Sequence, residues 1–171
     1  GTSKVFRIPT SYADAVHFAN ATWMEFPNID TDVVRCPVVG DTFGRYYWAC
    51  PTDRPRVNSL ANIQAGNTSP FELGVPQPAG TPALAITGGA SSTVVSRAYA
   101  LTYVTAFCEE GPPSTPVVGN GKIDASWDLT FTAPTSGVIA SNNLSKVRVY
   151  RTVTSTAGVA TYFFVAELDV N

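Results

Sequence analysis

The sequence predicts a mainly β protein whose C-terminal part, residues 81–171, forms an antiparallel β-sandwich. Side chains alternate along several runs with the period of two that is typical of strands. These runs are short and are separated by polar or glycine-containing turns, as in sandwich domains. No segment with helical periodicity lies between them that could serve as a crossover connection, so the sheets should be antiparallel.

The longest of these runs, Thr93–Phe107, is predicted to be the central strand. Large side chains alternate with small ones along it, and charge is almost absent from both faces. Such a strand is typically covered on both sides. Gly111, Pro112 and Pro113 follow, and proline has no backbone N–H to donate. We therefore expect strand pairing to end there.

Four further strands are predicted: Ala83–Thr87, Ser126–Thr132, Leu144–Thr152 and Ala160–Leu168. In the second of these, Trp127, Leu129 and Phe131 should point inward. In the third, Val147, Val149 and Arg151 share one face, and Lys146, Arg148 and Tyr150 share the other. In the last, Tyr162, Phe164, Ala166 and Leu168 should share one face, opposite Phe163, Val165 and Glu167.

Two connections complete the predicted sandwich. Gly119-Asn120-Gly121 is expected to form a turn after the short fragment Val117-Val118. Ala133 to Asn143 is expected to be a polar loop.

Residues 1–80 are predicted to hold smaller elements. Lys4–Ile8 alternates and is closed by Pro9, which favours an edge strand. Val16, Ala19, Trp23 and Phe26 recur at helical spacing, which predicts a short helix over about 12–24. Two strand-like runs, 33–39 and 44–50, flank Gly40-Asp41 and predict a hairpin.

Residues 51–82 are rich in proline and have little periodicity. This pattern predicts a stiff extended arm that lies on a partner surface, with a domain boundary near residue 80. Its apolar members include Phe71 and Leu73.

Composition excludes several partners. Only 14% of the residues are charged, and the net charge is −2 with basic residues scattered singly. We therefore expect neither nucleic acid nor a membrane surface as a partner. The three cysteines, Cys36, Cys50 and Cys108, lack paired spacing, which favours free buried thiols in a reducing compartment. A bridge between Cys36 and Cys50 remains an alternative.

The search for catalytic chemistry finds no nucleophile motif, phosphate loop or metal cluster, so no catalytic, cofactor or metal residues are assigned. His17 stands alone and is interpreted as a surface or packing residue. Asp30, Asp32 and Asp41 could be oxygen ligands, but capping of turn amides is the favoured interpretation. Glu109 and Glu110 point to opposite faces of an extended chain and are expected to solvate the end of the central strand.

The aromatic run Tyr46-Tyr47-Trp48 has two interpretations. Tyr46 and Trp48 would share one face of a strand, where they could form a platform for stacking on a sugar. Burial in the core is the commoner fate of such a trio.

The sequence also resembles a module found in structural proteins of tailed-bacteriophage and prophage virions, in particular tail proteins. The resemblance rests on residues 99–114, 127–134, 146–152 and 162–168, and upstream on 37–41, 45–48 and 55–57. The same strands look like an immunoglobulin or fibronectin type III sandwich, in which a tyrosine-rich strand runs into a Gly-x-x-Ser loop. In the type III order that strand would come last, so the resemblance implies a permuted connectivity or two neighbouring repeats.

This resemblance implies a non-enzymatic structural component of a virion, made in the bacterial cytoplasm and docked to other virion subunits as a homo-oligomer. Tyr46, Trp48, Phe71 and Leu73 are the candidate interface residues. The alternative is a carbohydrate-binding or adhesion module of a larger secreted or tail-fibre protein. The first and last residues of the sequence suggest a piece of a longer protein.

Overall fold

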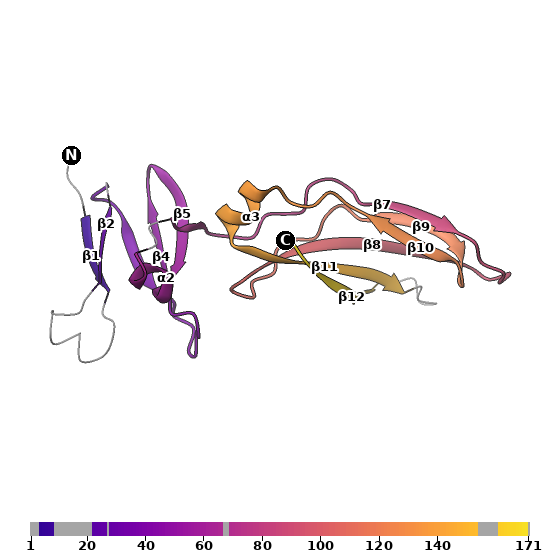
Figure 1. Cartoon of the computed structure of the whole chain (residues 1–171), viewed down its shortest axis with the longest axis horizontal. Helices are drawn as coiled ribbons and strands as arrows, with labels where there is room; N and C mark the ends of the chain where they lie inside the picture. The colour runs from indigo at the N-terminus through magenta and orange to yellow at the C-terminus, as the bar shows by residue number, and fades with distance from the viewer. Residues whose placement is uncertain (1–3, 9–21, 27, 67–68, 154–160, 171) are drawn as a thin grey trace. The chain divides into compact units, whose positions relative to one another are not determined.

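The computed structural model describes residues 4–8, 22–26, 28–66, 69–153 and 161–170. The chain divides into two compact units, Gly1–Leu73 and Gly74–Asn171. Both are built mainly from antiparallel strands, which confirms the predicted fold class (Figure 1). We had expected a boundary near residue 80, and the division follows Leu73.

Unit 1 begins with a two-stranded hairpin. The predicted strand Lys4–Ile8 is β1, and it pairs antiparallel with β2, Thr22–Phe26. Most of the helix predicted over about 12–24 lies outside the described residues, but its last part is wrong because β2 is a strand. Burial alternates along β2, with Trp23 exposed and Phe26 buried, so the period of two prevails over the helical spacing.

A four-stranded antiparallel sheet follows, in the order β3-β4-β5-β6. Strands β3, Asp32–Arg35, and β4, Arg45–Cys50, form the predicted hairpin. The prediction of an extended arm over 51–82 is wrong for its first part. That part contains β5, Asp53–Ser59, the helix α2, Leu60–Gln64, and β6, Phe71–Glu72.

Local chemistry explains these missed elements. The Ser59 side chain accepts a hydrogen bond from the Asn62 backbone N–H and so caps α2. Pro55 lies in β5 without interrupting the sheet, because its carbonyl oxygen accepts a hydrogen bond from the Leu73 N–H at 2.8 Å. Proline removes a donor from a strand but leaves the acceptor.

The core of unit 1 lies between the hairpin, the sheet and α2. Tyr46 and Ile63 are buried at its centre, surrounded by half-buried neighbours: Phe6, Met24, Val33, Trp48 and Leu60. The rings of Phe26 and Trp48 meet edge to face, with 5.7 Å between their centroids. The β1–β2 hairpin is therefore part of this core.

Unit 2 is a sandwich of a four-stranded sheet, β12-β11-β8-β9, and a two-stranded sheet, β10-β7 (Figure 1). The strands are β7 Ala83–Thr87, β8 Val94–Thr105, β9 Val117–Lys122, β10 Ser126–Thr130, β11 Leu144–Val153 and β12 Thr161–Asp169. Strand β8 is central, as predicted, and its residues 99–105 are buried on both faces.

The two sheets enclose one apolar core. Tyr99, Leu101, Tyr103, Leu144, Val147 and Val149 of the larger sheet are buried. Leu84, Trp127, Leu129 and Phe131 pack against them, which confirms the predicted inward face of β10. The loop predicted over 133–143 is wrong in part, because it contains the helix α3, Ser136–Asn142, capped by the Thr135 side chain.

Gly119 and Gly121 lie within β9 rather than in the predicted turn. A Cβ on Gly119 would stand 2.6 Å from Leu84 Cδ2, and one on Gly121 would stand 2.6 Å from Ile86 Cγ2. The glycines therefore permit a close approach of the second sheet. In a sequence, a glycine that is needed for such an approach looks the same as a glycine that makes a turn.

Pairing continues past the prolines, contrary to expectation. After a turn, the chain returns alongside β8, where Gly111 N–H donates to Tyr103 O and Ser114 N–H donates to Leu101 O. Three residues on the returning segment therefore span the length of two residues on β8, as in a bulge. Pro112 and Pro113 occupy the positions between the two hydrogen bonds, where no donor is required.

A second bulge changes the faces of β12. Val149 pairs with Ala166, but the next residue, Tyr150, pairs with Phe164, so Val165 is the extra residue. An extra residue reverses the alternation beyond it. The predicted common face of Tyr162, Phe164, Ala166 and Leu168 is therefore wrong, since Ala166 packs toward the sandwich core while Phe164 contacts Tyr150 on the outer face.

We expect Gly121→Ala to lower the free energy of unfolding of unit 2 by roughly 1–3 kcal/mol, because the new methyl group overpacks the contact with Ile86. Gly137→Ala is the matched control. A Cβ at this position would meet no atom within 4 Å, and Gly137 lies in the helix α3, where alanine is well tolerated. Urea unfolding monitored by fluorescence measures both variants. Equal effects of the two substitutions would contradict the packing role of Gly121.

Candidate functional site

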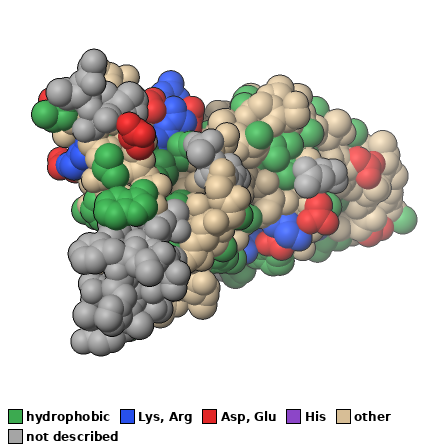
Figure 2. Space-filling model, turned by 60° about the vertical axis from the view of Figure 1, so that its left-hand side comes forward, with side chains coloured by type: hydrophobic (Ala, Val, Ile, Leu, Met, Phe, Trp, Pro, Cys, Tyr) green, Lys and Arg blue, Asp and Glu red, His purple; other side chains and the backbone are tan. Residues whose placement is uncertain are grey.

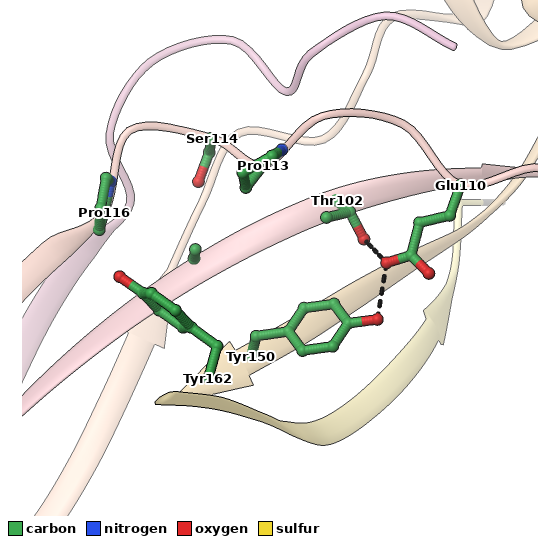
Figure 3. A pocket seen from close by; sticks show the side chains of 8 residues that line it. Thr102, Glu110, Pro113, Ser114, Pro116, Tyr150 and Tyr162 are labelled. Atoms are coloured by element: carbon green, nitrogen blue, oxygen red, sulfur yellow. Dashed lines mark hydrogen bonds between the residues drawn. The ribbon is translucent and has the colours of Figure 1, made fainter. Parts of the chain in front are cut away.

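The carboxylate of Glu110, which lies just after the turn that follows β8, accepts hydrogen bonds from three side chains. Thr102 Oγ1 and Tyr150 Oη each donate a hydrogen bond to its Oε1, both at 2.6 Å (Figure 3). Arg148 Nη1 donates to its Oε2, also at 2.6 Å. One carboxylate therefore joins β8, the returning segment and β11 on the outer face of the sheet.

The cluster continues to the sheet edge through Arg148. Its Nε donates to Glu167 Oε2 on β12 at 2.8 Å, and Lys146 Nζ lies 2.6 Å from Asp169 Oδ1. Figure 2 shows that acidic and basic side chains lie in several separate groups, next to apolar side chains, on the side in view. We call Glu110, Thr102, Arg148, Tyr150 and Glu167 the Glu110 cluster.

These contacts fix the charge state of the cluster. Partial burial alone would raise the pKa of Glu110, but the hydrogen bonds from Thr102, Tyr150 and Arg148 outweigh it and lower that pKa. Burial and the neighbouring Glu110 carboxylate raise the pKa of Tyr150. Hydrogen bonds to Glu167 and Glu110 raise the pKa of Arg148, so at neutral pH this pair of carboxylates faces a permanent cation.

A small pocket of about 270 Å³ opens beside the cluster. Figure 3 shows Tyr150 and Tyr162 on one side and the returning segment, with Pro113, Ser114 and Pro116, on the other. The Ser114 hydroxyl accepts a hydrogen bond from Leu101 N–H and donates to Thr115 O. The Ser114 hydroxyl is thus already hydrogen-bonded within the chain. The walls of the pocket are therefore mainly apolar.

A larger cavity of about 510 Å³ lies in unit 1. The indole rings of Trp23 and Trp48 line it, together with Phe26 and the polar side chains of Glu25 and Gln64. Trp23 is 56% exposed, so part of this lining is open to solvent. Aromatic faces next to amide and carboxylate groups are a combination that can contact a sugar ring.

The structure places the four candidate interface residues in unit 1, in different environments. Tyr46 is 3% exposed and is therefore a core residue. Trp48 is half-buried against Phe26, and Phe71 is half-buried in β6, opposite Val57. Leu73 is 46% exposed and is the most accessible of the four.

The remaining candidates are also placed. The three cysteines are free thiols, but the prediction that they are buried is wrong, because Cys36 and Cys50 are half-buried and Cys108 is exposed. Cys36 and Cys50 lie at opposite ends of the β3–β4 hairpin. Asp41 accepts hydrogen bonds from the Phe43 and Arg45 backbone N–H groups, as expected for a turn carboxylate. Among the described residues no three His, Cys, Asp or Glu side chains gather as metal ligands. His17 lies outside the described residues.

The role of Glu110 was missed by the sequence analysis, which expected it only to solvate a strand end. The available signal was that Thr102 lies on the small-residue face of the central strand, while Arg148 and Tyr150 share a face of a later strand. Using this signal requires the pairing of β8 with β11, in which Arg148 lies opposite Thr102. That pairing is not evident from alternation alone.

Within the described ranges, no helix is long and apolar enough to cross a membrane. No family model matches the chain, and no curated protein or solved structure matches it.

We expect Glu110→Gln to lower the free energy of unfolding at pH 7 by roughly 1–2 kcal/mol, because it weakens the hydrogen bonds to Arg148 around a carboxylate that is 29% exposed. The folded-state pKa of Glu110 lies below its ordinary value of 4.5. The carboxylate's contribution is therefore complete above pH 4.5 and is lost as the pH falls through the lowered folded-state pKa.

Denaturant unfolding over a range of pH measures this difference between Glu110→Gln and the unaltered chain. Asp169→Asn is the control, because its ion pair with Lys146 is exposed to solvent and should contribute little to stability. A destabilisation by Glu110→Gln that stays constant down to the most acidic pH would contradict the assigned charge state.

Proposed function

We propose that this chain is a non-enzymatic structural component of a bacteriophage virion, acting as an assembly module of a tail protein. The resemblance of its strands to such proteins suggests the setting. The main observation in favour of an assembly role is the exposure of β12. Four consecutive large apolar residues of this strand, Tyr162 to Val165, are each 40–57% exposed. Contiguous exposed apolar surface typically marks a protein interface.

The strand order supports the sandwich family that the resemblance implies. In immunoglobulin-like domains, strands G, F and C are neighbours in one sheet, and B and E are neighbours in the other. The order β12-β11-β8-β9 fits G-F-C with one added strand, and β7 with β10 fits B with E. On this assignment the tyrosine-rich β8 is strand C, and no permutation is needed.

The geometry of the Glu110 cluster supports a structural role for these residues. The carboxylate is engaged by three donors, and Arg148 is engaged by two carboxylates. A catalytic base or nucleophile needs a free position facing a substrate. This cluster instead holds strands together, as expected of a rigid docking module that contacts other virion subunits.

We expect the gene for this chain to lie among genes for a portal, a terminase and a capsid protein. Sequencing the DNA on both sides of it tests the setting, and mass spectrometry of gradient-purified particles from the same source tests incorporation directly. Neighbouring genes for secretion or polysaccharide degradation, together with absence from particles, would contradict the virion proposal.

A carbohydrate-binding module is the second candidate, favoured by the cavity beside Trp23 and Trp48. A glycan array probed with the unaltered chain and with Trp23→Ala tests it. Trp23 is the better position for substitution because Trp48 also belongs to the core cluster of unit 1. Binding that Trp23→Ala removes would support this candidate over the virion proposal.

A further inference from the structure

Strand β12 is the edge of the larger sheet of unit 2. It pairs with β11 on one side, and in the described part of the chain no strand pairs with its other side. It is nine residues long, whereas edge strands in soluble proteins are commonly short. Within the described residues, the backbone N–H and C=O groups on this side have no strand partner, so they can bind another strand.

Both faces of β12 are apolar. Phe164 lies on the outer face, where its ring contacts Tyr150, while Phe163 lies opposite Arg151 and faces the other way. Their side chains are 57% and 53% exposed. A strand that is apolar on both faces is typical of a sheet interior. Strand β12 thus has the composition of an interior strand in an edge position.

The usual protection against edge pairing is weak here. Residues 161–166 contain no charge and no proline, and the bulge at Val165 is the one protective feature among them. The acidic residues of the strand, Glu167 and Asp169, are paired with Arg148 and Lys146 of the neighbouring β11. Their charges are therefore partly neutralised within the sheet.

We propose that β12 pairs antiparallel with β12 of a second copy of this chain about a two-fold axis, joining the two larger sheets into one continuous sheet. A two-fold contact uses the same surface on both partners, and an uncharged apolar segment suits such self-pairing. In antiparallel pairing about a two-fold axis at one residue of the segment 162–165, Glu167 and Asp169 of one strand lie opposite or beyond the uncharged first residues of the other. Parallel pairing would align Glu167 with Glu167 of the second copy, and like charges directly opposite are destabilising.

The exposed area sets the strength of this contact. A buried aromatic side chain contributes about 150–250 Å². The half-exposed side chains of Tyr162, Phe163, Phe164, Val165 and Leu168 can therefore supply at most on the order of 400 Å² per copy, about half of the ~800 Å² per partner in a standard interface. We expect a weak dimer that depends on concentration, as suits a subunit that is concentrated during assembly.

The inference deepens the proposed function, on which its biological meaning rests, because it names the surface through which copies associate. Sedimentation velocity of the full chain over a wide concentration range tests it. We expect the mass to rise from monomer to dimer, and hydrogen exchange of the amides in 161–166 to slow as the dimer forms.

Val165→Lys should abolish dimerisation, since it places two cations near each other across the two-fold axis. Val118→Lys is the matched control, because Val118 is 65% exposed on β9, at the opposite edge of the same sheet. Phe163→Lys provides a second substitution in β12, and circular dichroism checks that each variant is folded. Dimers should persist in Val118→Lys.

Each other outcome overturns the inference. A chain that stays monomeric, or a dimer that survives both substitutions in β12, shows that β12 does not pair with itself. Loss of the dimer in Val118→Lys points to another surface, and open-ended oligomers show pairing of unlike edges. If the isolated chain stays monomeric but is present in purified particles, this inference alone is wrong. If the isolated chain forms a β12-dependent dimer but is absent from particles, the virion proposal alone is wrong.

Discussion

The burial of β8 on both faces is the constraint on which unit 2 depends. Its large side chains, such as Tyr99, Leu101 and Tyr103, form the sandwich core. Its small side chains, Ala100 and Thr102, face the pocket beside Glu110. The second sheet packs against the face of β8 that carries the large side chains. The segment that returns from the turn lies beside β8 and, with the Glu110 cluster, covers part of the other face. The Glu110 cluster ties that segment to the next strand.

The alternation of large and small or apolar and polar side chains predicted the features that are encoded within a single strand. It identified β1, the β3–β4 hairpin, β7, β8, β10, β11 and β12, because a period of two is visible within the sequence of each strand. It also predicted that Trp127, Leu129 and Phe131 point inward. A mainly β fold with antiparallel sheets follows from these elements alone.

The features that sequence reasoning missed depend on neighbours that are distant in the chain. Position 121 of β9 requires a glycine because Ile86 approaches it closely, and Glu110 is hydrogen-bonded because Arg148 and Tyr150 lie on the neighbouring β11. The bulge at Val165 is visible only in the pairing of β11 with β12. The density of prolines over 51–82 predicted an extended arm, but β5 and α2 form in its first part. Strand pairing and the cap from Ser59 prevail there over local composition.

The segment that returns beside β8 also bears on the order in which unit 2 folds. Its hydrogen bonds to β8 join residues close in sequence, such as Gly111 and Tyr103, so the loop that must close is short. Strand β11 comes from much farther along the chain, so a longer loop must close before it can pair with β8. Arg148 and Tyr150 share one face, and both bond the same carboxylate. A slip of β11 by one residue would turn both away from it, so Glu110 marks the correct register.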